Sequence, residues 1–293
     1  MNTIEMNNIK DGQSYYESVK SEIMNYASWN QLRALELIDD GIESCVLKCF
    51  SEDYGYAILK KRKNVSIIED EYNTLVEYNG RCFCKIFDGD IKNGIILEEQ
   101  VLPGTELRKV ESLDKRLSIF CSLHKELHIK PSVDVKYPTY MDWVIKITRY
   151  METREDYKEL YCYMKKAESI CKELFLMYPS RMLLHGDLHH DNILLNNRNE
   201  YTIIDPKGVI GDPIFDIPRF ILNEMEDNID LELYEKIEYI TRVIGKQLNI
   251  PIRVVKQVFY IEMTMAECWN AEDGMTPNLH NVIFAERVLT TAE

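Results

Sequence analysis

The sequence predicts an α+β protein with a small β-rich N-terminal lobe and a larger, mostly helical C-terminal lobe. Short β-rich runs bounded by turn residues dominate the first hundred residues, whereas apolar residues at helical spacing dominate the rest. With 293 residues, 45% of them hydrophobic, the chain can bury a full core. We expect a connector at 98–104 to separate an N-terminal lobe, residues 1–101, from a C-terminal lobe, residues 102–293.

The N-terminal lobe is predicted to begin with a helix over residues 15–37. Asp39 and Asp40 are followed by Gly41, which can cap the carboxyl end of a helix. Beyond this glycine the pattern changes to short strands separated by turns. It predicts two hairpins with a helix between them: strands at 42–50 and 56–60, a helix at 67–79, and strands at 82–87 and 95–101.

The C-terminal lobe is predicted to be almost entirely helical. Leu113, Leu117, Phe120 and Leu127 share helical spacing and predict a helix that ends before His128. Towards the carboxyl end, the apolar pattern predicts four further helices, at 214–225, 231–248, 253–269 and 278–289. No internal repeat interrupts this pattern.

The stretch from His185 to Gly208 carries the most chemical information. Asp187 and Asn192 lie on a predicted irregular loop, and Asp205 follows a β-branched run that the turn at 196–199 folds back along the chain. Phosphoryl transfer from a magnesium nucleotide needs a carboxylate that orients the acceptor hydroxyl and two oxygen ligands for the metal. These three side chains, at the spacing of a kinase catalytic loop, predict a phosphotransferase site.

On these residues the chain resembles the aminoglycoside phosphotransferase family, whose fold is similar to that of protein kinases. The resemblance implies a two-lobed protein-kinase-like fold, with Asp187 as the catalytic aspartate, Asn192 and Asp205 as Mg²⁺ ligands, and ATP or GTP as the phosphoryl donor. Gly186 stands where protein kinases usually have arginine, which favours a small-molecule kinase. The segment 205–219 looks most like the subgroup of streptomycin-type aminoglycoside kinases and hydroxyurea kinases.

The nucleotide side of the site is predicted on the strand at 56–60. Its last residue, Lys60, resembles the strand lysine that grips the α- and β-phosphates, and Glu71 could hold the ammonium in place. Lys61 and Glu69 are the alternatives. Strand alternation puts Lys60 and Lys61 on opposite faces, so only one can serve. A solvated lysine at a strand end is the structural alternative.

The rest of the nucleotide pocket is less specific. Gly55 is the only glycine between residues 42 and 60, so a glycine-rich phosphate loop is absent from the sequence. Ser51 is a candidate for phosphate contact in this turn, with an ordinary turn residue as the alternative. The connector from Glu99 to Val101 is expected to supply backbone groups for the nucleobase.

The acceptor is predicted to bind in the helical lobe. Glu262 is a carboxylate on a helix face that otherwise carries Val255, Phe259, Ala266 and Trp269. A carboxylate in such surroundings is costly unless it is paired or faces a wet cleft. We therefore expect Glu262, with Glu267 and Asp273, to contact a cationic acceptor. The alternative is that Glu262 pairs with an arginine or lysine from elsewhere in the chain.

Other polar residues near the motif are predicted to have supporting roles. Asp216 is expected to accept backbone N–H groups and brace the catalytic loop. Asp212 and Lys207 have no role that the sequence can assign. His189 and His190 are adjacent and diverge in an extended loop, so a zinc site is not expected.

Composition narrows the class of protein. The net charge of −14 argues against a nucleic-acid partner and suits a cationic small molecule. The eight cysteines are scattered and contain no CxxC pair, which predicts that they are reduced thiols. The sequence has no long apolar run and no secretion signal, which predicts a cytoplasmic enzyme. Two alternatives remain. One is a metabolic kinase for choline, ethanolamine, a methylthio sugar or homoserine, and the other is an inactive nucleotide-binding regulator. Oligomeric state is left open.

Overall fold

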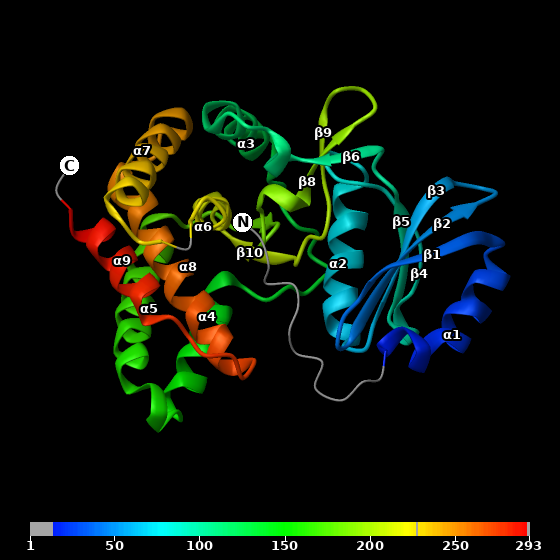
Figure 1. The fold of residues 1–293 in the computed structure, drawn as a ribbon, viewed down its shortest axis with the longest axis horizontal. Coiled ribbons are helices and arrows are strands. Elements are labelled where there is room, and N and C mark those ends of the chain that lie inside the picture. Colours follow the sequence, from blue (N-terminus) through cyan, green and yellow to red (C-terminus); the bar gives the residue numbers. More distant parts are fainter. Residues whose placement is uncertain (1–13, 227, 292–293) are drawn as a thin grey trace. The chain divides into compact units, whose positions relative to one another are not determined.

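The computed structural model describes residues 14–226 and 228–291, which form two compact units (Figure 1). The first unit comprises the described residues up to Thr105 together with Leu194–Lys207, and the second comprises Glu106–Ile193 and the described residues from Gly208 onward.

The division differs from the predicted one in two ways. The first unit extends to Thr105 rather than to residue 101, and it also includes the hairpin that carries Asp205. This hairpin joins the first unit through Ile203, whose N–H donates to the Cys82 carbonyl and whose carbonyl accepts from the Cys84 N–H, at 2.8 and 3.0 Å. Such a pairing across more than a hundred residues leaves no local signal in the sequence.

A five-stranded antiparallel sheet forms the centre of the first unit, with the strand order β1-β2-β3-β5-β4. Its strands are β1 (Leu32–Asp40), β2 (Ser44–Ser51), β3 (Gly55–Arg62), β4 (Ile86–Asp90) and β5 (Ile95–Glu99). Two helices accompany it, α1 (Tyr15–Trp29) and α2 (Val65–Tyr78). A separate small sheet has the order β6-β8-β9, with β6 at Pro103–Glu106, β8 at Ile193–Asn196 and β9 at Tyr201–Ile203.

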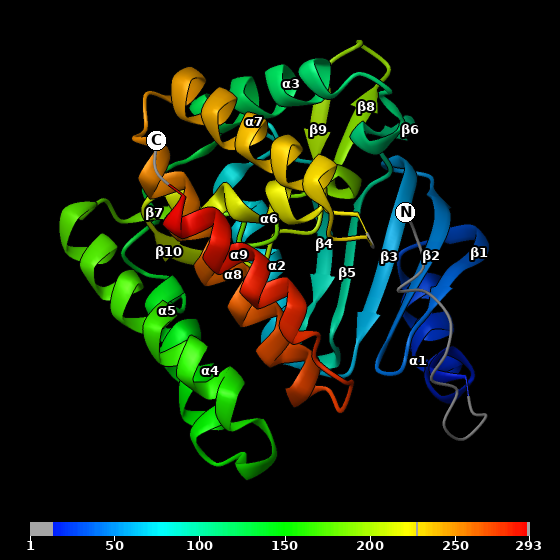
Figure 2. The ribbon, with the colours of Figure 1, turned by 60° about the vertical axis from the view of Figure 1, so that its left-hand side comes forward.

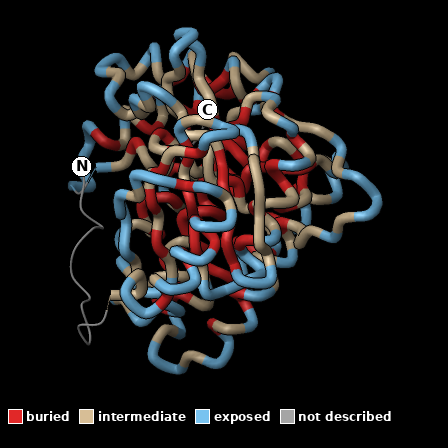
Figure 3. The backbone as a smooth tube through the Cα atoms, turned by 90° about the vertical axis from the view of Figure 1, so that its right-hand side faces the viewer, coloured by how far each residue is buried: buried red, intermediate tan, exposed pale blue. Residues whose placement is uncertain are grey.

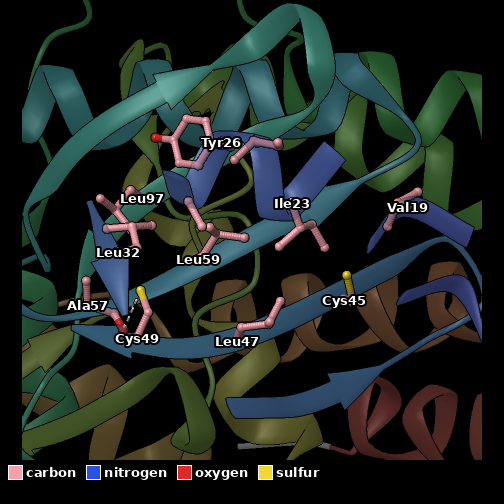
Figure 4. Close-up of a cluster of buried hydrophobic side chains, with 12 residues drawn as sticks. Val19, Ile23, Tyr26, Leu32, Cys45, Leu47, Cys49, Ala57, Leu59 and Leu97 are labelled. Atoms are coloured by element: carbon pink, nitrogen blue, oxygen red, sulfur yellow. Dashed lines mark hydrogen bonds between the residues drawn. The ribbon is translucent and has the colours of Figure 1, made fainter. Parts of the chain in front are cut away.

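Helix α1 covers one face of the five-stranded sheet through the apolar cluster drawn in Figure 4. Along β2 every second residue is buried, as expected for a strand with one face on a core. Each fully buried aliphatic side chain contributes about 1.5–3 kcal/mol relative to exposure. The cluster comprises Val19, Ile23, Tyr26, Ala27, Leu32, Cys45, Leu47, Cys49, Ala57, Leu59, Ile95 and Leu97.

The predicted helix over residues 15–37 is wrong in its second half. Helix α1 ends at Trp29, and the chain from Leu32 onward forms strand β1. The Asn30 N–H closes the helix on the Tyr26 carbonyl, and Gln31 adopts a φ of 51°, which turns the chain out of the helix. Pairing of β1 with β2 then outweighs the helix propensity of this leucine- and glutamate-containing segment.

The second unit is mostly helical. Its helices are α3 (Leu113–Leu127), α4 (Tyr140–Glu152), α5 (Lys158–Met177), α6 (Pro218–Leu222), α7 (Leu231–Leu248), α8 (Ile252–Glu272) and α9 (Leu279–Thr290). The long helix α8 contacts α4, α5, α6, α7 and α9, and Figure 2 shows α9 running beside it. Because α8 has neighbours on several sides, its polar positions are also buried.

The predicted helices at 231–248, 253–269 and 278–289 are confirmed, with small shifts at their ends. The predicted helix at 214–225 is replaced by a short 3₁₀ turn, Pro213–Asp216, and the short helix α6. Pro218 explains the break, since it lacks an N–H and favours the first turn of a new helix.

Buried stretches, red in Figure 3, are enclosed by exposed turns and helix faces. Among the described residues, no helix has the length and apolar character needed to cross a membrane.

Candidate active site

The first unit holds a buried ammonium among carboxylates. Lys60 Nζ lies 2.7 Å from Glu71 Oε1 on α2 and 2.8 Å from Glu98 Oε1 on β5, and it also contacts Asp205. Lys60 is 4% exposed. Burial by itself lowers the pKa of Lys60, but the charges of Glu71 and Glu98 outweigh burial and raise it above its usual value. The lysine is therefore charged and fixed.

Strand alternation selects Lys60 over its neighbour, as the sequence predicts. Lys61 Nζ lies 3.0 Å from Glu22 Oε2 on α1, so Lys61 points to the sheet face that α1 covers. Lys60 points to the opposite face, where α2 presents Glu71. The predicted pairing of Lys60 with Glu71 is thus present, and the alternative of a solvated lysine is wrong.

Glu98 is the member of this cluster that sequence reasoning missed. Burial raises the pKa of Glu98, and the attraction of Lys60 does not offset it. Burial also raises the pKa of Glu71, but there the charges of Lys60 and Arg62 prevail and lower it. The available signal was a glutamate inside the apolar strand Ile95–Glu99, two residues from Ile96 and therefore on the same face.

Asp205 belongs to the same cluster and has an uncommon backbone conformation. Its φ is 58°, in the left-handed region that costs a non-glycine residue about 1–2 kcal/mol. Backbone strain of this kind is concentrated at functional sites. Among the described residues, Glu71, Glu98 and Asp205 form the group whose ligand atoms lie within 4.8 Å of one another.

The remaining nucleotide-side candidates have defined local contacts. Ser51 is buried, and its Oγ accepts from the N–H groups of Asp53 and Tyr54 at 3.3 and 3.4 Å, in the turn between β2 and β3. The Glu99 backbone N–H donates to the Lys85 carbonyl at 2.8 Å, and its carboxylate accepts from the Lys85 N–H. Val101 lies just beyond β5 and is partly exposed. Their contacts with a nucleotide stay predictions.

The second unit contains the loop predicted to be catalytic, which follows β7 (Met182–Leu184). The Asp187 N–H donates to His185 Nδ1 at 3.0 Å, and Asn192 Nδ2 donates to the Asp187 carbonyl at 3.0 Å. The loop therefore folds Asn192 back onto Asp187, five residues earlier in the chain. The Asn192 side-chain nitrogen also lies 3.2 Å from His189 Nε2, and the side-chain oxygen is the atom that could bind a cation.

Asp216 braces this loop, as predicted. Its carboxylate accepts from the N–H groups of His185 and Gly186 at 2.8 and 2.7 Å and lies 3.0 Å from His128 Nε2. Burial raises the pKa of Asp216, but the hydrogen bonds and the charge of His128 prevail and lower it. Asp212 caps the turn before it, accepting from the Ile214 N–H at 3.1 Å.

Two further anchors hold the far side of the loop. His190 Nε2 lies 2.8 Å from Glu224 Oε1, and Arg116 contacts both oxygens of Glu224 at 2.6 and 2.7 Å. Arg108 binds Asp191 in the same bidentate way, with its Nε 2.6 Å from Asp191 Oδ1 and its Nη2 2.8 Å from Asp191 Oδ2. These contacts hold His190 and Asp191, which lie between Asp187 and Asn192 in the sequence.

The predicted acceptor carboxylates occupy very different environments. Glu262 is 2% exposed, lies 2.7 Å from Arg219 Nε and accepts a hydrogen bond from the Tyr140 hydroxyl. The pairing that the sequence left as an alternative is therefore present. Glu267 is also buried and accepts from Asn278 and Asn281, both at 2.7 Å, which ties α8 to the start of α9. Asp273 is exposed at the end of α8.

The fold, the Lys60–Glu71 pair and the catalytic loop together define a protein-kinase-like phosphotransferase. Residues 29–274 match the model of the aminoglycoside/hydroxyurea antibiotic resistance kinase family. The chain belongs to this family.

Curated relatives are distant. A streptomycin 6-kinase of Streptomyces griseus is 24% identical over 48% of this chain and 46% of its own length. A hydroxyurea phosphotransferase of Kitasatospora aureofaciens is 29% identical over 39% of this chain and 30% of its own length. The chain thus aligns with less than half of each of these two relatives.

Similar solved structures cover nearly the whole chain. The choline kinase LicA from Streptococcus pneumoniae has a TM-score of 0.65 at 16% identity, covering 94% of this chain and all of its own. The aminoglycoside phosphotransferase APH(4)-Ia has a TM-score of 0.60 at 13% identity, covering 92% of this chain and 97% of its own. At these identities the likeness establishes the protein-kinase-like fold.

Proposed function

We propose that the chain is an ATP- and Mg²⁺-dependent O-phosphotransferase that transfers one phosphoryl group to a hydroxyl of a cationic, streptomycin-like aminoglycoside, as an antibiotic-resistance enzyme would. The observation that carries the proposal is the catalytic loop, in which Asn192 folds back onto Asp187 while Asp216 fixes the backbone before it. GTP is the alternative donor.

The residues have distinct roles in this proposal. Lys60, held by Glu71, binds the α- and β-phosphates, with Ser51 at the phosphates and the backbone of Glu99 and Val101 at the nucleobase. Asp187 orients the acceptor hydroxyl and accepts its proton.

Asp205 and Asn192 are proposed as Mg²⁺ ligands on the chemistry of their side chains. A carboxylate from Asp205 and an amide oxygen from Asn192 are the hard oxygen ligands that Mg²⁺ prefers. The metal would neutralise charge on the phosphates. A structure of LicA contains AMP, and a structure of an APH(4)-Ia mutant contains AMP-PNP and hygromycin B, which supports a nucleotide and an aminoglycoside as ligands of this fold.

The cationic acceptor is supported by the family, by relatives named streptomycin 6-kinases and by the acidic charge of the chain. Of the three predicted carboxylates, we propose Asp273 for direct contact, since it is exposed. Glu262 and Glu267 are buried and already have protein partners.

One observation favours a second candidate, a kinase for a small alcohol such as choline or ethanolamine. A polycationic acceptor needs several available carboxylates, and two of the three predicted ones are engaged within the protein. The choline and ethanolamine kinases with the same fold fit this alternative.

The deciding experiment incubates the purified 293-residue chain with Mg²⁺ and labelled ATP, or labelled GTP in parallel. The acceptors are streptomycin, hygromycin B, hydroxyurea, choline and ethanolamine, and mass spectrometry identifies the product. We expect one phosphoryl group on streptomycin. Transfer to choline or ethanolamine alone would select the second candidate. Failure of the chain to bind or turn over either nucleotide would identify it as something other than a kinase.

A further inference from the structure

Arg219 lies between the catalytic aspartate and a buried glutamate. It is on α6, and its Nε is 3.5 Å from Asp187 Oδ1 and 2.7 Å from Glu262 Oε1 on α8. All three residues belong to the second unit. The Arg219 and Asp187 side chains are 23% and 20% exposed, whereas Glu262 is almost fully enclosed.

Two groups contact the Arg219 side chain from the side of the core, Glu262 and Trp269, and Tyr140 holds the first of them. Glu262 supplies the counter-charge, and the Tyr140 hydroxyl, at the start of α4, donates to the same carboxylate. The indole ring of Trp269 lies 5.1 Å from the guanidinium carbon, in cation–π contact. A guanidinium held in this way has few alternative rotamers, so it can hold a neighbouring carboxylate in a defined orientation.

We propose that Arg219 is a positioning residue for Asp187, and that Glu262 affects phosphoryl transfer by holding Arg219 instead of touching the acceptor. This inference rests on the proposed function, because it assigns Asp187 the catalytic role. The same Asp187 oxygen that faces Arg219 also lies 3.9 Å from His189 Nε2, so two nitrogen-bearing side chains approach it. In this proposal the two contacts favour one rotation of the Asp187 carboxylate, the one that orients the acceptor hydroxyl.

The test removes both charges of the pair at once. The double variant Arg219→Gln/Glu262→Gln keeps the shape of the pair and leaves no uncompensated buried charge. We expect kcat to fall about 10²-fold, the scale associated with misplacing a reacting group by about 1 Å, while the KM values for ATP and acceptor stay within about threefold.

A matched control is available on the same helix. Lys256 on α8 lies 2.9 Å from Glu238 on α7, again as a buried ion pair, but outside the catalytic loop. The variant Lys256→Gln/Glu238→Gln should keep kcat within about twofold of wild type. A similar loss of kcat in both variants would mean that Arg219 only stabilises the fold, and it would overturn the inference.

Combining the double variant with Asp187→Asn distinguishes a role of Arg219 in positioning Asp187 from a role in stabilising the fold. If Arg219 acts through Asp187, adding the double substitution to Asp187→Asn should cause no further loss of kcat, because the group that it positions is already disabled. Losses that multiply would overturn the inference. So would an unchanged kcat with a raised acceptor KM, since that pattern assigns the pair to direct acceptor binding.

The conservative variant Arg219→Lys keeps the charge but loses the planar guanidinium. It should retain intermediate turnover, with kcat reduced about tenfold, and it carries the test if the double variant does not fold. If Arg219→Lys kept the kcat of the wild type, the inference would be overturned. If the wild-type protein transfers no phosphoryl group, both the proposed function and the inference are refuted. If the wild type is active and the variants keep its kcat, only the inference is refuted.

Discussion

Asp187 is held from two sides of its own loop, by His185 at its N–H and by Asn192 at its carbonyl. These backbone contacts leave the orientation of its carboxylate to other groups. The residue can therefore be changed chemically without removing the hydrogen bonds that shape the loop.

We predict that Asp187→Asn lowers kcat by at least about 10³-fold and leaves the affinity for Mg-ATP unchanged, because the role of the carboxylate is confined to the transition state. Single-turnover kinetics and calorimetric titration with Mg-ATP measure the two quantities. A kcat within about tenfold of wild type, roughly 1.4 kcal/mol of barrier, would falsify the assignment.

Lys60 and Lys61 are adjacent residues on opposite faces of β3, which makes them a matched pair. We predict that Lys60→Met abolishes Mg-ATP binding and lowers the free energy of unfolding by about 3–5 kcal/mol, since Glu71 and Glu98 lose their shared buried partner. Lys61→Met should retain Mg-ATP affinity, because Lys61 pairs with the half-exposed Glu22 on the other face. Calorimetric titration and urea denaturation measure both effects, and equal loss of Mg-ATP affinity in the two variants would contradict the assignment.

At the scale of elements, the short segment around α6 organises the loop that carries Asp187. Asp216 binds the backbone at the start of the loop, Arg219 faces Asp187, and Glu224 anchors His190. The break at Pro218 is important here, because it separates the turn that carries Asp216 from the helix that carries Arg219. A continuous helix over 214–225 would present these side chains at different angles.

Glu224 should give this segment an acid-sensitive stability. Burial raises its pKa, but hydrogen bonds from His190 and Arg116 prevail and lower it to about 2 from a usual value of 4.5. A lowered folded-state pKa means that the stabilisation is present above about pH 4.5 and is lost as the pH falls towards 2. We predict that about 2 kcal/mol of unfolding free energy is lost over this range through Glu224, after allowance for solvent screening.

Urea denaturation at several pH values measures this effect. Glu224→Gln should be less stable than wild type at pH 6 and should show a shallower decline in unfolding free energy between pH 4.5 and 2. The control is Glu43→Gln, which removes a carboxylate from the exposed pair with Lys63 and should leave the slope unchanged. Parallel curves for wild type and Glu224→Gln would contradict the prediction.

At the scale of the whole molecule, the net charge of −14 bears on acceptor capture. Attraction between a cationic aminoglycoside and exposed carboxylates is screened over about 8 Å at physiological ionic strength. We predict that the streptomycin KM rises with added potassium chloride while kcat changes little. A neutral alcohol tested in parallel is the control, and a streptomycin KM independent of salt would count against a cationic acceptor.

The sequence alone determined the family and the general architecture, and it predicted which residues are catalytic. The spacing of Asp187, Asn192 and Asp205 is a local property of one stretch, and the family match extends over the surrounding chain. Strand alternation likewise distinguished Lys60 from Lys61, because the side-chain period of a strand is fixed by its backbone.

Tertiary structure decided everything that depends on a distant partner. Pairing with β2 made a strand of residues that have helix propensity, and pairing of β5 with β3 brought Glu98 to Lys60. The sequence predicts Glu262 as a carboxylate available to an acceptor, whereas in the folded chain it is paired with Arg219, 43 residues away in the sequence. The physical reason is that the cost of a buried charge depends on which opposite charge lies within a few ångströms, and only the folded chain determines that neighbour.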